Sequence, residues 1–374
     1  MKENILNNKT FINTLNQHGT CLYISTKAII NNHKILQKTS NNTVAYVLKN
    51  NAYGLGVENI CPILYREGCK EFFVAALEEA YAIKRFAPTA KIYVFNGILN
   101  NQATEMYKHG FIPVLNSLTQ IQSWQDLASN KQTTLPCLLH IETGIHRLGL
   151  EKNDIEHLQK NPKLLEGLNI LYIIAHFACA DIYKHNSVEQ QYENFVALTS
   201  KLPKAKYSIS ASYGLFVKPK YRFNLSRVGI ALYGGNPTPH TQNPMEPVIF
   251  FFSTILQVKT LNVGEHVGYG FNFEAKRKTK LAVLPVGYAD GIMRSASNKG
   301  FVYIGKYKAP IIGTISMDLT TIDITDIPEE FHKAGQMVEL IGNNISLNDF
   351  ANNADTIHCE ILNVLGSRYP RVYQ

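Results

Sequence analysis

The sequence predicts a protein of the α/β plus β class, in which an eight-stranded β/α barrel is followed by a mostly β C-terminal domain. The length of 374 residues exceeds what one typical core accommodates and suits two domains. Short apolar runs alternate with amphipathic segments in the first part of the chain. After Gly235 the pattern changes to strand-like runs with little helical periodicity. These observations together predict the two-part architecture.

The strands of the first domain are predicted by short runs rich in β-branched and aromatic residues. Eight such runs lie at 43–48, 72–76, 92–95, 112–115, 137–141, 169–175, 207–210 and 227–232. Between them, segments such as 77–85, 118–128 and 187–201 carry apolar residues at every third or fourth position and predict helices. Strands that alternate with helices indicate a parallel sheet. Their number and spacing favour a closed TIM-type barrel, although an open doubly wound sheet would give a similar pattern.

The second part of the chain predicts a β-rich domain. After a Pro-containing linker at 236–239, strand-like runs separated by Gly-containing turns lie at 248–258, 281–286, 301–304, 309–315 and 337–341. We therefore expect the barrel at 26–238 and the β-rich domain at 239–374. The run at about 19–25 is also strand-like and is compatible with either domain. Residues 1–18 form a polar, Asn-rich leader.

Composition and charge argue against several functional classes. No apolar run approaches the roughly 20 residues that cross a bilayer, and the start of the chain lacks the apolar stretch of a secretory signal. We therefore expect a cytoplasmic protein. The six cysteines form no CxxC pair, which disfavours a disulfide framework or a metal site. The net charge of +8 is scattered and no nucleic-acid module is visible, so we interpret it as a basic surface that attracts small anionic ligands.

Candidate catalytic groups are expected where the barrel strands end, because active sites of β/α barrels lie at the carboxyl ends of the strands. Lys49 directly follows the first predicted strand. An ammonium group there must find a partner or lose its proton, and the unprotonated amine is the form that condenses with an aldehyde. The alternative is a lysine that simply extends into solvent at the rim.

Other polar residues follow later strands of the predicted barrel. Arg147 is suited to binding a carboxylate through two hydrogen bonds, or else pairs with a surface acid. His176 ends an apolar run, where a histidine is more often a core residue with satisfied hydrogen bonds than a catalytic group. Ser212 follows the seventh expected strand, and the backbone at Gly229 and Ile230 lies near the start of the eighth, in the region where barrels often bind phosphate. A lysine at the first strand and a phosphate site at the last are together typical of a pyridoxal phosphate site.

Further segments make the chain similar to a known family. Beside Lys49, residues 52–54 and Gly56 match, and so do the segments 143–149, 227–234, 267–270, 287–291 and 316–318. Their order and approximate spacing resemble those of the alanine racemases, from about Cys21 to Tyr373. The resemblance implies a pyridoxal-phosphate-dependent isomerase that interconverts L-alanine and D-alanine, supplies D-alanine for bacterial peptidoglycan, and works as a homodimer with composite active sites.

The resemblance also implies a role for each candidate residue. Lys49 would hold the cofactor and act as one of two proton-transferring bases, and Tyr269 of the partner subunit would be the other. The phosphate would be bound by Tyr53, Ser212, Gly229 and Ile230. Arg227 would face the pyridine nitrogen, with His176 as a hydrogen-bond link between Tyr269 and Arg227. The substrate carboxylate would be held by Arg147 and the partner's Met317 N–H, and the partner's Tyr288 would limit side-chain size at the entrance.

Three positions depart from the family pattern. Many relatives have a lysine at the position of His140, where it forms a carbamate that orients the carboxylate-binding arginine; here Glu142, a bound anion or His140 itself would have to position Arg147. Cys359 stands at the place of a phosphate-binding tyrosine, which predicts weaker retention of the cofactor. Ala211 precedes Ser212 where an asparagine is usual, and the sequence gives no account of the effect.

Two other interpretations remain open at this point. The first is another pyridoxal phosphate enzyme on the same barrel, either a decarboxylase or a racemase of broader specificity. Arg227 disfavours the decarboxylase, because an arginine keeps its proton and leaves the cofactor ring neutral. The second is a non-catalytic protein that binds the cofactor, which the joint presence of Lys49, Tyr269, His176 and Arg227 disfavours.

Overall fold

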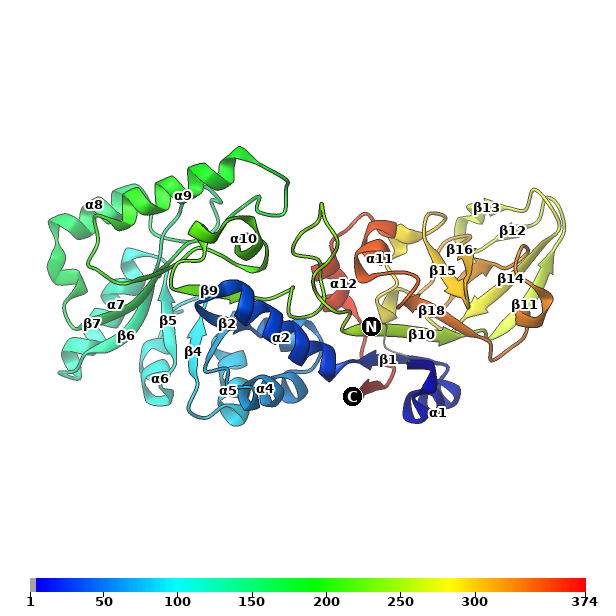
Figure 1. Cartoon of the computed structure of the whole chain (residues 1–374), viewed down its shortest axis with the longest axis horizontal. Helices are drawn as coiled ribbons and strands as arrows, with labels where there is room; N and C mark the ends of the chain where they lie inside the picture. Colours follow the sequence, from blue (N-terminus) through cyan, green and yellow to red (C-terminus); the bar gives the residue numbers. More distant parts are fainter. Residues whose placement is uncertain (1–4) are drawn as a thin grey trace. The chain divides into compact units, whose positions relative to one another are not determined.

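The computed structural model describes residues 5–374 and divides the chain into two compact units, which we describe separately. The barrel unit consists of Ile30–Leu232 and Asn236–Met245. The β-rich unit consists of the chain up to Ile29, Tyr233–Gly235 and Glu246–Gln374. Figure 1 shows the elements of both units along the chain.

The barrel unit is built on a parallel sheet of eight strands in the order β8-β7-β6-β5-β4-β3-β2-β9. The strands are β2 (Thr43–Val47), β3 (Glu71–Val74), β4 (Lys91–Val94), β5 (Ile112–Leu115), β6 (Leu135–His140), β7 (Leu168–Ile174), β8 (Lys206–Ser208) and β9 (Leu225–Val228). Between β8 and β9, the N–H of Asn224 donates to Tyr207 O and that of Arg227 donates to Ser210 O, both at 3.0 Å. The sheet is therefore a nearly closed barrel, which confirms the fold class expected from the sequence.

Helices connect the strands on the outside of the barrel (Figure 1). They are α2 (Thr26–Ser40), α4 (Val57–Arg66), α5 (Leu77–Phe86), α6 (Gln102–His109), α7 (Leu118–Asn130), α8 (Lys152–Lys160), α9 (Asn186–Thr199) and α10 (Ser212–Val217), with 3-10 turns at Pro162–Leu165 and Pro219–Tyr221. Three of them, α5, α7 and α9, coincide closely with the segments whose periodicity predicts helices. The short segment α3 (Lys49–Tyr53) is a left-handed turn at the end of β2.

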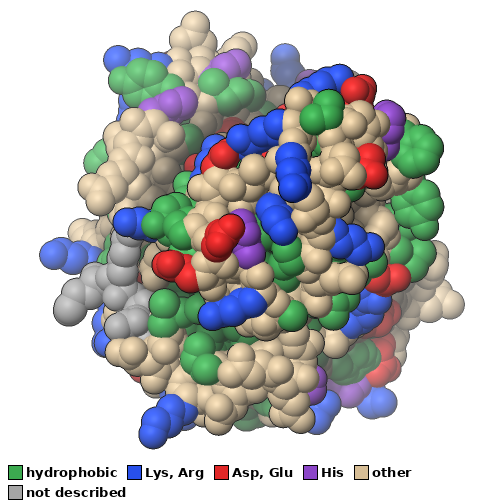
Figure 2. Space-filling model, turned by 90° about the vertical axis from the view of Figure 1, so that its right-hand side faces the viewer, with side chains coloured by type: hydrophobic (Ala, Val, Ile, Leu, Met, Phe, Trp, Pro, Cys, Tyr) green, Lys and Arg blue, Asp and Glu red, His purple; other side chains and the backbone are tan. Residues whose placement is uncertain are grey.

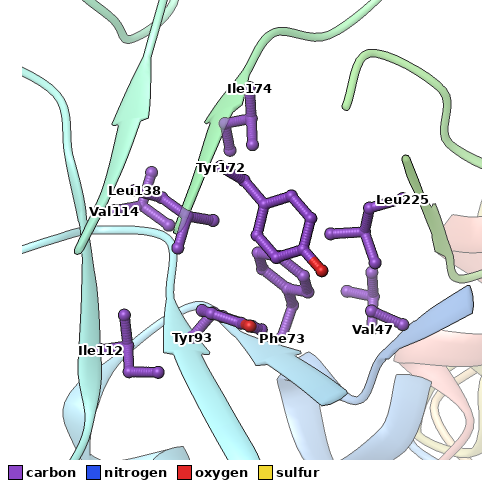
Figure 3. Packing of buried hydrophobic residues seen from close by; sticks show 10 residues of the cluster. Val47, Phe73, Tyr93, Ile112, Val114, Leu138, Tyr172, Ile174 and Leu225 are labelled. Carbon is purple, nitrogen blue, oxygen red and sulfur yellow. The ribbon is translucent and has the colours of Figure 1, made fainter. Parts of the chain in front are cut away.

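Side chains from the strands fill the interior of the barrel (Figure 3). Phe73 and Tyr93 stack with ring centroids 4.6 Å apart. The hydroxyls of Tyr93 and Tyr172 donate to the carboxylate of Glu71 at 3.0 and 3.4 Å, so both buried phenols have acceptors. The interior is a packed core, and polar groups are left for the ends of the strands.

The β-rich unit contains a sheet of six strands in the order β16-β15-β18-β10-β1-β19, with sheets of three and two strands, β11-β14-β17 and β12-β13. The strands are β1 (Thr20–Ile24), β10 (Ile249–Thr254), β11 (Gln257–Leu261), β12 (His266–Val267), β13 (Phe273–Glu274), β14 (Thr279–Leu284), β15 (Phe301–Ile304), β16 (Tyr307–Pro310), β17 (Thr320–Asp323), β18 (Met337–Ile341) and β19 (Arg371–Tyr373). Two helices follow late in the chain, α11 (Leu347–Asn353) and α12 (His358–Val364). The early strand β1 pairs antiparallel with β10 and parallel with β19, so it lies in the β-rich unit.

The start of the chain is not a separate leader where the structure describes it. Residues Lys9–His18 form helix α1, which is polar overall but buries Phe11 and Leu15 on one face. These two residues, four positions apart, pack with Tyr23, Phe250 and Phe252 in one cluster. The expected leader at 1–18 is thus corrected for its described part, because two apolar residues at helical spacing suffice to dock a polar helix. Residues 1–4 lie outside the described residues.

Within residues 5–374, no helix combines the length and apolarity needed to cross a membrane. The six cysteines, all of which the structure describes, form no disulfide. On the face shown in Figure 2, Lys and Arg side chains are interspersed with Asp and Glu side chains rather than gathered in one continuous patch.

Candidate active site

Lys49 begins a left-handed turn at the carboxyl end of β2. Asn50, Asn51, Ala52 and Tyr53 all have φ between 49° and 56°. Such a conformation costs roughly 1–2 kcal/mol for each residue that has a Cβ. The turn is held by backbone hydrogen bonds from Ala52 to Leu48 (3.0 Å) and from Gly54 to Asn50 (2.8 Å), and the carboxylate of Glu79 accepts from the N–H of Asn50. Lys49 and Tyr53 therefore lie at the two ends of one rigid, strained turn.

Tyr53 and two groups from the last strands form a small polar cradle. A Cβ built at Gly229 would lie 2.2 Å from the hydroxyl of Tyr53, so this hydroxyl occupies the space above the glycine. The hydroxyl of Ser212 accepts from the N–H groups of Gly229 and Ala231, each at 3.2 Å. Ile230, which stands between Gly229 and Ala231 in the sequence, is buried. Because Ser212 Oγ accepts from these two N–H groups, its own O–H remains to donate, and together with the Tyr53 hydroxyl it is suited to binding a phosphate.

Arg227 lies in β9 and is buried, with 3% of its surface exposed. Its guanidinium donates to the carbonyl oxygen of Ser208 at 2.9 Å, to the Ser208 hydroxyl, and to the carbonyl oxygen of Ala175. Among the described residues it forms no ion pair with a carboxylate. Burial, together with the charge of Arg147, lowers the pKa of Arg227 to about 9, so the group stays cationic at neutral pH.

His176 follows β7 and lies near several positive groups. Burial is the main cause that lowers its pKa to about 3, and the charges of Arg227 and Arg147 act in the same direction. The imidazole is therefore neutral at physiological pH and can donate with one ring nitrogen and accept with the other. Its backbone carbonyl accepts from Gln191 Nε2 at 3.0 Å, which anchors the end of the strand.

Arg147 lies in the loop between β6 and α8, and its side chain is exposed in the single chain. The carboxylate of Glu142 organises this loop by accepting from the backbone N–H groups of Gly144, Ile145 (2.7 Å) and Arg147 (3.3 Å). Although burial raises the pKa of Glu142, these N–H donors lower it by more, and the net shift is downward. Glu142 thus fixes the backbone of Arg147.

The three remaining site candidates lie in the β-rich unit, on loops that adjoin one another. Tyr269, Tyr288 and Met317 have 74%, 44% and 54% of their surfaces exposed. Hydrogen bonds join their loops: Tyr288 N donates to Ser316 O and Ala289 N to Met317 O, both at 3.0 Å, and the hydroxyl of Thr314 donates to Tyr269 O at 2.8 Å. The β-rich unit therefore presents these three side chains together on its surface.

An ion-pair network supports two of these loops. The buried carboxylate of Asp290 accepts from the guanidinium of Arg368 at 2.9 and 2.6 Å and from the N–H of Gly287 at 2.9 Å. The same guanidinium also donates to Asp318 at 2.5 Å. Arg368 thus ties the segment that carries Tyr288 to the segment that follows Met317. The sequence does not single out this network, because its members are far apart in the chain.

The structure separates the site candidates into two groups. Barrel strand ends bring one group together, namely Lys49, Tyr53, Arg147, His176, Ser212, Arg227, Gly229 and Ile230. Tyr269, Tyr288 and Met317 belong to the β-rich unit, as does Cys359 in α12. One further polar residue at a barrel strand end, Asn116, follows β5 directly and was not predicted from the sequence. The rule that active-site residues follow barrel strands would have found it.

Comparisons with known proteins agree along most of the chain. A family model described as the alanine racemase N-terminal domain matches residues 24–237, and one for the alanine racemase C-terminal domain matches residues 248–373. The chain is 42% identical to an alanine racemase of Rickettsia bellii over 88% of this chain and 81% of that protein. It is 39% identical to one of Brucella suis over 95% and 93%.

Solved structures of alanine racemases also match nearly the full length of this chain. The crystal structure of alanine racemase from Bartonella henselae with covalently bound pyridoxal phosphate superimposes with a TM-score of 0.92 at 37% identity, over 95% of this chain and 99% of that one. The alanine racemase of Acinetobacter baumannii superimposes with a TM-score of 0.86 at 29% identity, over 96% and 100%.

Proposed function

The chain belongs to the alanine racemase family, and we propose that it interconverts L-alanine and D-alanine with pyridoxal phosphate as its cofactor. One observation carries the proposal beyond family membership. A single strained turn joins Lys49, an amine at a barrel strand end, to Tyr53, whose hydroxyl closes the cradle over Gly229. An aldehyde and a phosphate on one small molecule fit this pairing of groups.

The described residues fit the cofactor. Lys49 would supply the amine that attaches it, and Tyr53, Ser212 and the backbone at Gly229 and Ile230 would bind its phosphate. Arg227 supplies a permanent donor for its ring nitrogen. When bound, the cofactor accepts the electron pair that remains on the substrate's α-carbon after the proton leaves. The protein must then control which protons move and from which side.

We assign proton transfer to two residues on opposite faces of the substrate. Lys49 takes or returns the α-proton on one face, and Tyr269 of a second copy of the chain does so on the other. The exposure of Tyr269, Tyr288 and Met317 in the single chain supports this arrangement, because all three are available to a partner. The active form in this proposal is a homodimer with composite sites. His176, which is neutral, would connect Tyr269 to Arg227 by hydrogen bonds.

Arg227 favours racemisation over other reactions of this cofactor class. Its guanidinium remains protonated at neutral pH and has only neutral oxygen acceptors in the structure. A group that already carries its proton gives the ring nitrogen a hydrogen bond but no additional proton. With the ring nitrogen left unprotonated in this way, Arg227 would favour return of a proton to the α-carbon over side reactions.

Substrate binding is assigned to groups around the same strand ends. Arg147 would bind the carboxylate together with the partner's Met317 N–H, and the partner's Tyr288 would restrict the side chain to the size of a methyl group. We place the reaction in the cytoplasm, which six cysteines without a disulfide support, and expect its product D-alanine to serve peptidoglycan synthesis.

The test is conversion of pure L-alanine to D-alanine, and the reverse, by purified protein with added pyridoxal phosphate. We expect turnover in both directions and its loss in Lys49→Ala, with Lys306→Ala in the β-rich unit as a control that leaves turnover intact. Serine and larger amino acids tested in parallel measure the breadth of specificity. A protein that binds the cofactor but turns over no alanine would contradict the proposal.

A further inference from the structure

His140 is a buried histidine that the proposed chemistry does not use. It is the last residue of β6, and only 7% of its surface is exposed. Its Nδ1 lies 2.8 Å from Oδ1 of Asn116, the residue that follows β5. Both residues are therefore at the end of the barrel where Lys49, His176 and Arg227 lie. Among the described residues, no hydrogen bond is formed by Nε2 of His140.

The amide of Asn116 is fixed in one orientation. Its Nδ2 donates to the carbonyl oxygens of Phe95 at 2.8 Å and Val114 at 2.9 Å. Gln120 is fixed in the same way, since its Nε2 donates to Asn96 O (3.0 Å) while its Oε1 accepts from Asn116 N (2.8 Å). With both N–H bonds of Asn116 directed at carbonyls, the atom that faces His140 must be the acceptor oxygen.

It follows that His140 Nδ1 is the donor. A neutral imidazole with its proton on Nδ1 has a lone pair on Nε2. Burial lowers the pKa of His140 to about 4, the charges of Arg227 and Arg147 lower it too, and the charge of Glu142 opposes them. The ring is therefore neutral in the physiological range. Asn116 holds the ring in the tautomer whose Nε2 can accept a hydrogen bond, in a site that contains several cationic side chains.

The loop that carries Arg147 starts directly after His140 and returns to it at Leu150. Leu150 N donates to His140 O at 2.7 Å, and Ile141 and Leu150 form an isolated bridge. Glu142 is already occupied by the backbone N–H groups of this loop, and Arg147 forms no ion pair among the described residues. The charge of Arg147 acts on the His140 ring, so the two side chains are within electrostatic range, and Nε2 is an acceptor without a hydrogen bond among the described residues.

We propose that His140 is a positioning residue, which Asn116 fixes in its Nδ1–H tautomer so that Nε2 accepts a hydrogen bond from the guanidinium of Arg147. This bond orients the arginine toward the substrate carboxylate. The inference rests on the proposed function, in which Arg147 binds that carboxylate. It implies that a neutral acceptor, rather than an anion, holds the arginine in this chain.

Two amide variants separate this role from a structural one. In His140→Gln the longer amide reaches the place of Nε2, whereas in His140→Asn it reaches only the place of Nδ1. We expect His140→Asn to raise the KM for alanine at least about tenfold, because a hydrogen bond to a charged group is lost, and His140→Gln to restore most of it. The absorbance of the bound cofactor should be the same in both. Equal KM values in the two variants would overturn the proposal.

A second experiment does not depend on turnover. Nitrogen-15 NMR of the His140 ring in the holoenzyme should show a neutral Nδ1–H tautomer from about pH 5.5 to 8. Asn116→Asp, whose carboxylate stabilises a protonated ring, should make the KM high at low pH and lower as pH rises. An Nε2–H tautomer in the parent protein, or a KM of Asn116→Asp that is independent of pH, would contradict the role.

Propionate, which is alanine without its amino group, distinguishes this inference from the proposed function. Its dissociation constant from the holoenzyme should rise in His140→Asn and recover in His140→Gln. A protein that racemises no alanine but binds propionate with this dependence would overturn the proposed function and support the role of His140. Alanine turnover with propionate binding that is indifferent to position 140 would do the opposite.

Discussion

The hydroxyl of Tyr53 lies so close above Gly229 that a Cβ at position 229 would be 2.2 Å from it. Tyr53 comes from the turn after β2 and Gly229 from the residue after β9, and these strands are neighbours in the barrel. The position of the phenol therefore depends on the absence of a side chain at 229. Ser212, which follows β8, contacts the same backbone. The segments after three barrel strands therefore surround a space suited to one phosphate.

Gly229→Ala should weaken cofactor binding through Tyr53. The added methyl group must displace the phenol, and loss of a hydrogen bond to a charged phosphate predicts a dissociation constant for pyridoxal phosphate raised about ten- to hundredfold. The measurement is titration of the protein with the cofactor, followed by absorbance. In a Tyr53→Phe background the same glycine change should have a much smaller effect, because the hydroxyl is already gone. Independent effects of the two changes would refute the coupling.

The assignment of Lys49 and Tyr269 to different subunits predicts complementation. Lys49→Ala and Tyr269→Phe should each be inactive alone while retaining the folded structure. After the two are mixed and allowed to exchange subunits, half of the dimers are hybrids, and one site in each hybrid has both bases intact. Racemase activity should then recover to about a quarter of the parent value, as expected for a two-fold symmetric dimer. Tyr183→Phe, an exposed tyrosine in the barrel unit, serves as a control that should be fully active alone.

No recovery on mixing would place both bases in one subunit. Full activity of Tyr269→Phe by itself would instead remove the tyrosine from the mechanism and leave the cofactor site intact.

Arg368 should matter more through Asp290 than through Asp318. The carboxylate of Asp290 is buried, whereas that of Asp318 has more than half of its surface exposed. Removal of Arg368 leaves a buried charge without its partner, and exposed ion pairs contribute little. We expect Arg368→Ala to lower the melting temperature clearly and to raise the KM, because the Tyr288 segment loses its support. Asp318→Asn should change both quantities much less, and an equal effect would indicate that the exposed pair is the important one.

Cys359 gives a test of the departure from the family pattern. If this position faces the phosphate as the family resemblance implies, Cys359→Tyr should add a hydroxyl donor and improve retention of the cofactor. The comparison is the amount of pyridoxal phosphate that remains after prolonged dialysis, with Cys179→Ser as a control at the other partly exposed cysteine. A parent protein that retains the cofactor as firmly as the tyrosine variant would count against the assignment.

The barrel could be predicted from the sequence because its strands are buried and continuous. The run expected at 112–115 is β5 itself, and the other seven expected runs each overlap one observed strand. Four strands of the β-rich unit were missed, namely β12, β13, β17 and β19. β12 and β13 have two residues each, and Ile322 is the only apolar residue of β17 (Thr320–Asp323). β19 has three residues, which pair with β1 from the other end of the chain. Strands this short are defined by their long-range partners rather than by local pattern.

The sequence indicates candidate site residues but not their local geometry. Lys49 and Ser212 are candidates because they follow predicted strands, whereas Arg227 begins one and its role is implied by the family resemblance. The left-handed turn at Asn50–Tyr53 could not be read from the sequence, since four residues with side chains adopt it against their intrinsic preference. The tautomer of His140 likewise depends on the carbonyls that orient Asn116, which only the folded strands bring together.

His140 also predicts how stability depends on pH. Its pKa is lowered from 6.5 to about 4 in the folded protein, so the unfolded chain binds a proton more readily between these values. The folded state is therefore favoured above about pH 6.5, and this contribution is lost as the pH falls toward 4. A shift of that size corresponds to roughly 3 kcal/mol. His140→Gln cannot titrate, so it should lose less stability on acidification than the parent protein. Thermal unfolding of the two holoenzymes between pH 7 and 4.5 measures the difference. If the melting temperatures of both proteins fell in parallel with pH, His140 would be protonated in the folded state as easily as in the unfolded one.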